Sequence, residues 1–123
     1  MKKMLYSLLL SVILLQPTTR AFAKEENLPY VENLGYQVEV VDNNISLYSY
    51  DSGWKSFLGG SWIHGVNTSS VRSQFDHNSK THKTTVQGKG GKYSYSGWVS
   101  PRRRASASWE KAFTGNQAWA DVK

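Results

Sequence analysis

The stretch "SWIHGVNTSSVRSQFDHNSKTH", from Ser61 to His82, shows the pattern that decides the fold. It consists of short runs that mix apolar and polar residues and are separated by turn residues. "SWIHGV" is the first run, "VRSQF" follows the polar segment "NTSS", and "DHNS" ends the second run. A repeat of two residues is typical of β-strands, because successive side chains point to opposite faces. The stretch therefore predicts two short strands separated by a turn.

The same pattern continues to the end of the chain. The further runs are "THKTTVQ", which ends at the turn "GKGG", then "KYSYSGWV", "ASASWEKAF" and "QAWADV". Six short runs within one small domain predict an all-β fold, as an antiparallel β-sandwich or a small barrel. A helix from Ala105 to Phe113 is the main alternative, because Ala, Glu and Lys favour helices.

The chain before Ser61 shows a second alternating pattern. "YQVEVV" places Tyr36, Val38 and Val40 on one face, "DNN" at Asp42–Asn44 interrupts it, and "ISLYSY" resumes it. Two alternating runs around an Asp/Asn turn predict a β-hairpin. "DSGWKSFLGG" is then expected to be a turn-rich connector.

The first residues are typical of a secretory signal peptide. Two lysines precede the apolar run "MLYSLLLSVILL", and "AFA" supplies a small-x-small cleavage site, so residues 1–23 are predicted to be removed between Ala23 and Lys24. The apolar run is shorter than the roughly 20 residues that span a bilayer as a helix. An uncleaved anchor is the alternative. We expect a secreted protein.

The distribution of charge indicates which kinds of molecule the protein is expected to bind, and the lack of cysteine indicates how the fold is held together. Lys24–Gly60 holds two basic against six acidic residues, whereas Ser61–Lys123 holds ten basic against three acidic ones. A small basic unit is attracted to polyanions, which outside the cell are envelope lipids and wall polymers, so nucleic acid is not an expected partner. A basic surface that only confers solubility is the alternative. The chain has no cysteine, so packing of its aromatic residues must hold it together.

The three histidines of the chain, His64, His77 and His82, all lie in the opening stretch and raise the question of a metal or catalytic centre. Their spacing matches no recognised ligand pattern, and Asp76 is the only nearby carboxylate. No cysteine nucleophile and no G-x-S-x-G motif is present. We therefore expect no metal, no cofactor and no enzymatic activity.

Three motifs resemble the lactococcin 972 family of bacteriocins. "GGSWIHGV" is similar to its first motif through Gly60, Trp62, His64 and Gly65. "SKTHKTTV" is similar to the second through Ser79, Lys80, Thr81, His82 and Val86. "FTGNQAW", after an Arg-Ala stretch, is similar to the third through Gly115 and Asn116. The resemblance covers roughly residues 59–122.

The resemblance implies a small sandwich of two three-stranded antiparallel sheets in residues 59–123. It also implies a secreted antimicrobial protein that attacks related Gram-positive bacteria by binding the wall precursor lipid II and blocking septum formation. Lipid II or another anionic envelope component would be the partner, with a dedicated immunity and transport system in the producing cell; a homodimer stays open. Residues 24–58 depart from the family pattern. Three roles are open for them: extra strands, a pro-segment that is removed later, or an acidic segment that shields the charge of the basic domain.

Two groups of residues are therefore candidates. The expected target-binding residues are His64, Lys80, His82, Arg102, Arg103 and Arg104. The expected structural residues are Gly60, Trp62, Gly65, Trp109, Gly115 and Asn116. Three guanidinium groups suit phosphate, which they can bind bidentately, although a merely solvated loop is the alternative. A non-toxic module that binds the wall or a glycan, or a small wall hydrolase, are the alternative functions.

Overall fold

The computed structural model describes residues 27–40 and 49–123. The predicted signal peptide, its cleavage site and the turn Asp42–Asn44 lie outside the described residues. Within those ranges the chain forms ten β-strands and the 3-10 turn η4 (Lys89–Gly91), and no α-helix. The all-β prediction is confirmed.

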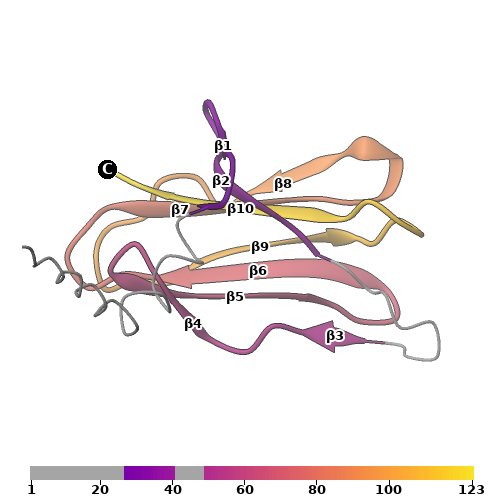
Figure 1. The fold of residues 1–123 in the computed structure, drawn as a ribbon, viewed down its shortest axis with the longest axis horizontal. Coiled ribbons are helices and arrows are strands. Elements are labelled where there is room, and N and C mark those ends of the chain that lie inside the picture. Colours follow the sequence, from indigo (N-terminus) through magenta and orange to yellow (C-terminus); the bar gives the residue numbers. More distant parts are fainter. Residues whose placement is uncertain (1–26, 41–48) are drawn as a thin grey trace, which may run out of the picture.

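The strands form two antiparallel sheets that lie one above the other as the two layers of a sandwich (Figure 1). In spatial order, sheet A consists of β1 (Tyr30–Val31), β2 (Gly35–Glu39), β10 (Gln117–Val122), β7 (His82–Gln87) and β8 (Tyr93–Tyr95). Sheet B consists of β3 (Tyr50–Asp51), β5 (Gly60–Val66), β6 (Ser70–Asp76) and β9 (Ala105–Glu110), and β4 (Lys55–Phe57) also pairs with β5.

The six runs predicted after Gly59 are the six strands β5 to β10. They supply three strands to each sheet, as the resemblance implied: β7, β8 and β10 to sheet A, and β5, β6 and β9 to sheet B. The preceding segment adds two further strands to each sheet, so each has five. The strands from residues 30–57 are thus hydrogen-bonded parts of the same sandwich.

The predicted hairpin around Asp42–Asn44 is wrong. Its first run forms β2, which pairs with β1 and β10 in sheet A, whereas its second run ends in β3, which pairs with β5 in sheet B. The physical reason is that β10 and β5 each present an edge with unpaired backbone groups, and the segment covers both edges. Tyr30–Glu39 forms a hairpin instead, and the expected connector contains β4, which forms a tight hairpin with β5.

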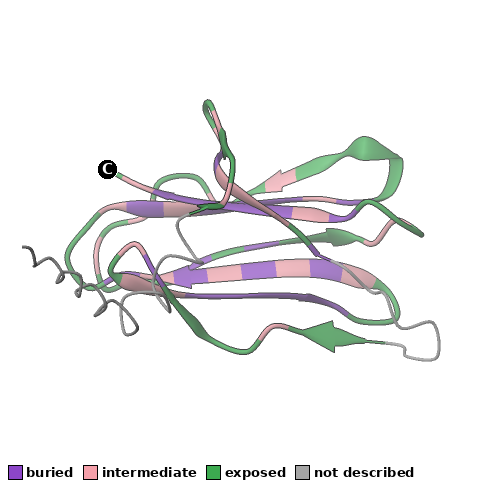
Figure 2. Ribbon diagram, viewed as in Figure 1, coloured by how far each residue is buried: buried purple, intermediate pink, exposed green. Residues whose placement is uncertain are grey.

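The core lies between the sheets and follows the alternation in the sequence. Along β6, Val71, Ser73 and Phe75 are fully buried while their neighbours are partly exposed, as Figure 2 shows in alternating colours. The facing side of sheet A supplies small side chains, Ala118 and Ala120. Because these are small, the large rings of sheet B can fill the space between the layers.

Aromatic side chains dominate the sheet B side of this core. Trp62 is 3% exposed, its ring centroid lies 4.9 Å from that of Phe57, and its Nε1 donates to Ser73 Oγ at 2.8 Å. Trp62 and His64 lie on the same face, with ring centroids 5.0 Å apart. Trp62 thus lies in the core. Full burial of so large a side chain, with its one polar group paired, stabilises a domain that has no disulfide.

Residues 105–113 form a strand followed by a loop, and not the alternative helix. Six residues of β9 pair in register with β6, from Ala105 opposite Phe75 to Glu110 opposite Ser70. This pairing buries Ala105 and Ala107, so tertiary contacts override the helical propensity of the segment. Trp109 lies near the end of this edge strand and is 40% exposed.

The glycines of the first motif have a steric role. A Cβ on Gly60 would lie 2.2 Å from the backbone oxygen of Asp76, and one on Gly65 equally close to that of Tyr50. In the third motif, Gly115 has a positive φ of 81°, which favours glycine. The adjacent Asn116 is buried, and its side-chain amide exchanges two hydrogen bonds with the backbone of Ala112, which closes the loop between β9 and β10.

Candidate functional site

Two loops meet where β6 ends and β7 begins, at the left end of the sandwich in Figure 1. One connects β6 to β7 and carries Lys80; the other connects β8 to β9 and carries Arg102, Arg103 and Arg104. All four side chains are exposed. We call these two loops the basic end. The structure thus brings together four of the six predicted target-binding residues.

The side chain of His82 contacts the backbone of both loops. It is fully buried, and its Nδ1 lies 2.8 Å from the backbone oxygen of Lys80 while its Nε2 lies 2.7 Å from that of Arg103. A carbonyl oxygen only accepts hydrogen bonds, so the ring nitrogen that carries the proton donates in these contacts; the tautomer decides which of the two carbonyls receives it. His82 therefore positions two exposed cations through their backbones, and its own ring has no exposed surface for a target.

The side chain of His77 contacts the backbone of the loop between β6 and β7. Its Nε2 donates to the backbone oxygen of Leu58 at 2.9 Å, and its Nδ1 accepts from the backbone nitrogens of Ser79 and Lys80. This pattern defines the tautomer, because Nδ1 can accept only when the proton is on Nε2. Both ring nitrogens of His77 are engaged with the backbone, as are those of His82.

Arg104 differs from its two neighbours because it is held by a carboxylate. Its Nε and Nη2 donate to the two carboxylate oxygens of Asp76 at 2.9 and 2.8 Å, and its guanidinium lies 4.9 Å from the ring centroid of Trp54. These hydrogen bonds from Arg104 lower the pKa of Asp76 and raise the pKa of Arg104. Arg102 and Arg103 are the more available of the three arginines.

The surface between the loops is hollowed. One hollow, of about 310 Å³, is lined by Asp76, His77, Asn78, Arg102, Arg103 and Arg104. A second hollow beside it is lined by Trp98, Val99, Ser100, Arg103 and Arg104. Guanidinium groups around an open, polar hollow suit a phosphate or another oxyanion, which forms short charge-assisted hydrogen bonds with them.

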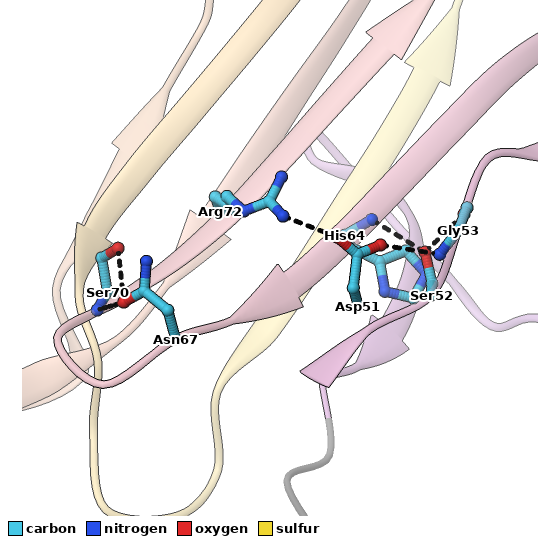
Figure 3. Close-up of polar contacts among 7 residues, drawn as sticks. All are labelled: Asp51, Ser52, Gly53, His64, Asn67, Ser70 and Arg72. Atoms are coloured by element: carbon cyan, nitrogen blue, oxygen red, sulfur yellow. Dashed lines mark hydrogen bonds and ion pairs between the residues drawn. The ribbon is translucent and has the colours of Figure 1, made fainter. Parts of the chain in front are cut away.

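His64 lies apart from the basic end. It is 8% exposed, and its backbone exchanges hydrogen bonds with Ser52, beside the ion pair between Asp51 and Arg72 (Figure 3). Its pKa is lowered from 6.5 to about 4, mainly by burial and also by the positive charge of Lys55, against the opposing effect of Asp51. Within the described residues its Nδ1 has no hydrogen-bond partner. His64 is a neutral core residue that a target cannot reach directly.

Three features of the basic end had no signal in the sequence. Asp76 and Arg104 are 28 positions apart, and neither spacing nor type marks them as a pair. The positions of Trp54 and Trp98 beside arginines depend on the sheet topology.

In residues 27–40 and 49–123, no group of histidine and carboxylate side chains is arranged to hold a metal ion. Those same ranges contain no helix with the length and apolar character that a membrane span requires.

The fold and the basic end define a class of protein: a two-sheet β-sandwich with cationic loops at one end, an arrangement suited to binding. No protein-family model, curated protein or solved structure matches this chain. The resemblance to the lactococcin 972 bacteriocins thus remains a hypothesis carried by the three motifs.

Proposed function

We propose that this protein is a secreted, bacteriocin-like antibacterial protein that binds an anionic component of the envelope of related Gram-positive bacteria, without catalytic turnover. The wall precursor lipid II is the specific target that the motif resemblance indicates, with arrest of septum formation as the consequence. Arginine and lysine side chains are suited to its pyrophosphate group.

One observation carries the proposal: buried histidines hold the exposed cations in place. His82 and His77 contact the backbones of both loops, so Lys80, Arg102 and Arg103 are presented on a defined surface. Fixing the loops before binding reduces the entropy that would be lost when a target orders them. A surface that served only for solubility would not need this support.

The arrangement favours binding over hydrolysis. The ring nitrogens of His77 and His82 all lie within hydrogen-bond distance of backbone atoms, so neither ring presents a nitrogen to a nucleophile. A non-toxic wall-binding module is the second candidate, and exposed tyrosines on sheet A favour it. Killing of related strains separates these two functions.

The test uses the secreted protein and vesicles that contain lipid II, with lipid-matched vesicles that contain undecaprenyl phosphate and vesicles without either. The Arg102→Gln/Arg103→Gln variant should bind lipid II vesicles at least about tenfold more weakly, and killing should fall in parallel. Lys89→Gln/Lys92→Gln is the matched control, because it removes the same charge beyond the other end of β7. Binding should also weaken steeply as salt rises.

Three results would contradict the proposal. Equal binding to vesicles with and without lipid II would exclude the precursor as the target. If both double variants lost the same amount of binding, the arginines would contribute only through the overall charge of the protein. Envelope binding without growth arrest or septal defects in any related strain would favour the non-toxic module.

A further inference from the structure

The outer face of sheet A carries aromatic and amide side chains in two cross-strand rows. Register places Gln37, Trp119, Thr85 and Tyr95 side by side across β2, β10, β7 and β8. The next row is Glu39, Gln117, Gln87 and Tyr93. Alternation along these strands turns both rows away from the core, since their neighbours Val38, Ala118 and Val86 belong to it.

The aromatic rings on this face pack against one another, and the two tyrosine rings remain accessible. Tyr93 and Tyr95 are 40% and 62% exposed, and their rings are nearly parallel, with centroids 5.8 Å apart. Trp119 lies beneath them: it is 2% exposed, and its ring centroid lies 5.6 Å from that of Tyr93. Trp119 Nε1 also donates to Gln37 Oε1 at 3.1 Å, which orients that amide beside the rings.

We propose that this face is a glycan-binding surface, on which Tyr93 and Tyr95 stack against sugar rings while the amides of Gln37 and Gln117 bond to hydroxyl groups. Sugar rings present both polarised C–H groups, which pack on aromatic faces, and hydroxyls, which need donors and acceptors at their edges. Tyrosine supplies a rigid apolar face with a polar end at low entropic cost.

Composition favours a glycan over a protein partner. Beside their rings the two rows contain three amides, a carboxylate and a hydroxyl, and no Met or Arg, two residue types in which protein interfaces are enriched. Its charges are balanced, with Glu39 and Asp121 against Lys83 and Lys123, so a polyanion such as nucleic acid gains little there. An uncharged polyhydroxylated chain fits both properties.

The surface also continues toward the basic end. Trp98 follows β8, and the ammonium groups of Lys83 and Lys123 lie 4.5 and 4.6 Å from its ring centroid. Trp98 also lines the hollow that contains Arg103 and Arg104. A glycan on the tyrosines can therefore carry an anionic substituent toward these cations, which extends the proposed envelope binding to the saccharide part of the target.

The test uses uncharged oligosaccharides, so that the arginines contribute little. Calorimetric titration of the secreted protein with oligomers of N-acetylglucosamine, glucose and galactose should show binding to at least one series, with little dependence on salt. Tyr95→Ala should weaken that binding about tenfold. Tyr93→Ala/Tyr95→Ala should abolish it. Phe113→Ser, which removes a ring that is 96% exposed outside this face, is the matched control and should change nothing.

The outcomes separate this surface from the proposed function. Arg102→Gln/Arg103→Gln should bind the uncharged oligosaccharide like the wild type, even if it no longer binds lipid II vesicles. Absence of binding to all three series, or equal binding by wild type and Tyr95→Ala, would overturn the glycan surface. Tighter binding to oligothymidylate than to any sugar would overturn it in favour of a single-strand nucleic-acid site.

Discussion

His82 Nε2 lies 2.7 Å from the backbone oxygen of Arg103, a residue 21 positions away in the sequence. This contact connects the start of β7 to the loop before β9, and the second ring nitrogen of His82 contacts Lys80 in the same way. The second motif of the sequence is thus linked to the arginines by one buried ring. We therefore expect stability and binding at the basic end to be coupled.

That coupling predicts the effect of removing the ring. His82→Ala removes the ring contacts with Lys80 and Arg103 and leaves a cavity, so the free energy of unfolding should fall by about 2–4 kcal/mol. His82→Gln should remain folded with a smaller loss, because its amide still donates. Urea unfolding measures both variants, and vesicle binding should weaken in both. Unchanged binding in a folded His82→Ala protein would show that binding does not depend on the contacts of His82 with the two loops.

Replacing Trp62 should cause the largest loss of stability. Trp62→Ala removes a ring that is 3% exposed and leaves Ser73 without this donor, at a cost of about 3–5 kcal/mol. A domain of this size has only about 5–15 kcal/mol in total, so the variant should be largely unfolded by circular dichroism. Trp109→Ala is the control, since Trp109 is 40% exposed and should cost far less. Equal losses would contradict the assignment of the core.

His64 predicts a dependence of stability on pH. Its pKa is about 4 in the folded protein and 6.5 when unfolded, so below pH 6.5 the unfolded chain binds a proton that the folded chain does not. Stability should therefore fall as the pH drops from 6.5 to 4, by up to about 3 kcal/mol from this residue. His64→Gln should flatten the curve over that window. Parallel curves for the two proteins would disprove a neutral buried His64.

Metal should not affect this protein. A zinc ion that bound only the folded form would raise the melting temperature by mass action, and a chelator would reverse the effect. We expect neither zinc nor chelator to shift the melting temperature of the purified protein. A chelator-induced drop that disappears in His64→Gln would restore the metal hypothesis.

The mature chain should begin at Lys24 and retain the strands that follow. Cleavage after Ala23 suits a signal peptidase. Further trimming to Gly59 would remove Phe57 from the core and leave the edges of β5 and β10 unpaired, which favours aggregation. Mass spectrometry of the secreted protein should therefore give the mass of residues 24–123. A mass that corresponds to residues 59–123 would identify the segment as a pro-segment.

Local pattern in the sequence was sufficient for the strands of residues 59–123. Period-two alternation and turn residues predicted all six strands from β5 to β10, because side-chain direction and turn geometry depend on near neighbours. The shared face of Trp62 and His64 follows from the same rule. The three-and-three division of these strands between the sheets came from the family resemblance.

Only the tertiary structure decided which strands pair and which polar groups meet. β2 and β3 lie in different sheets because the open edges of β10 and β5 compete for them, a choice that no local pattern encodes. His64 and His82 look alike in the sequence, yet one is a neutral core residue and the other joins two cationic loops. Hydrogen-bond partners and solvation depend on residues far away in the chain, and these determine what each histidine does.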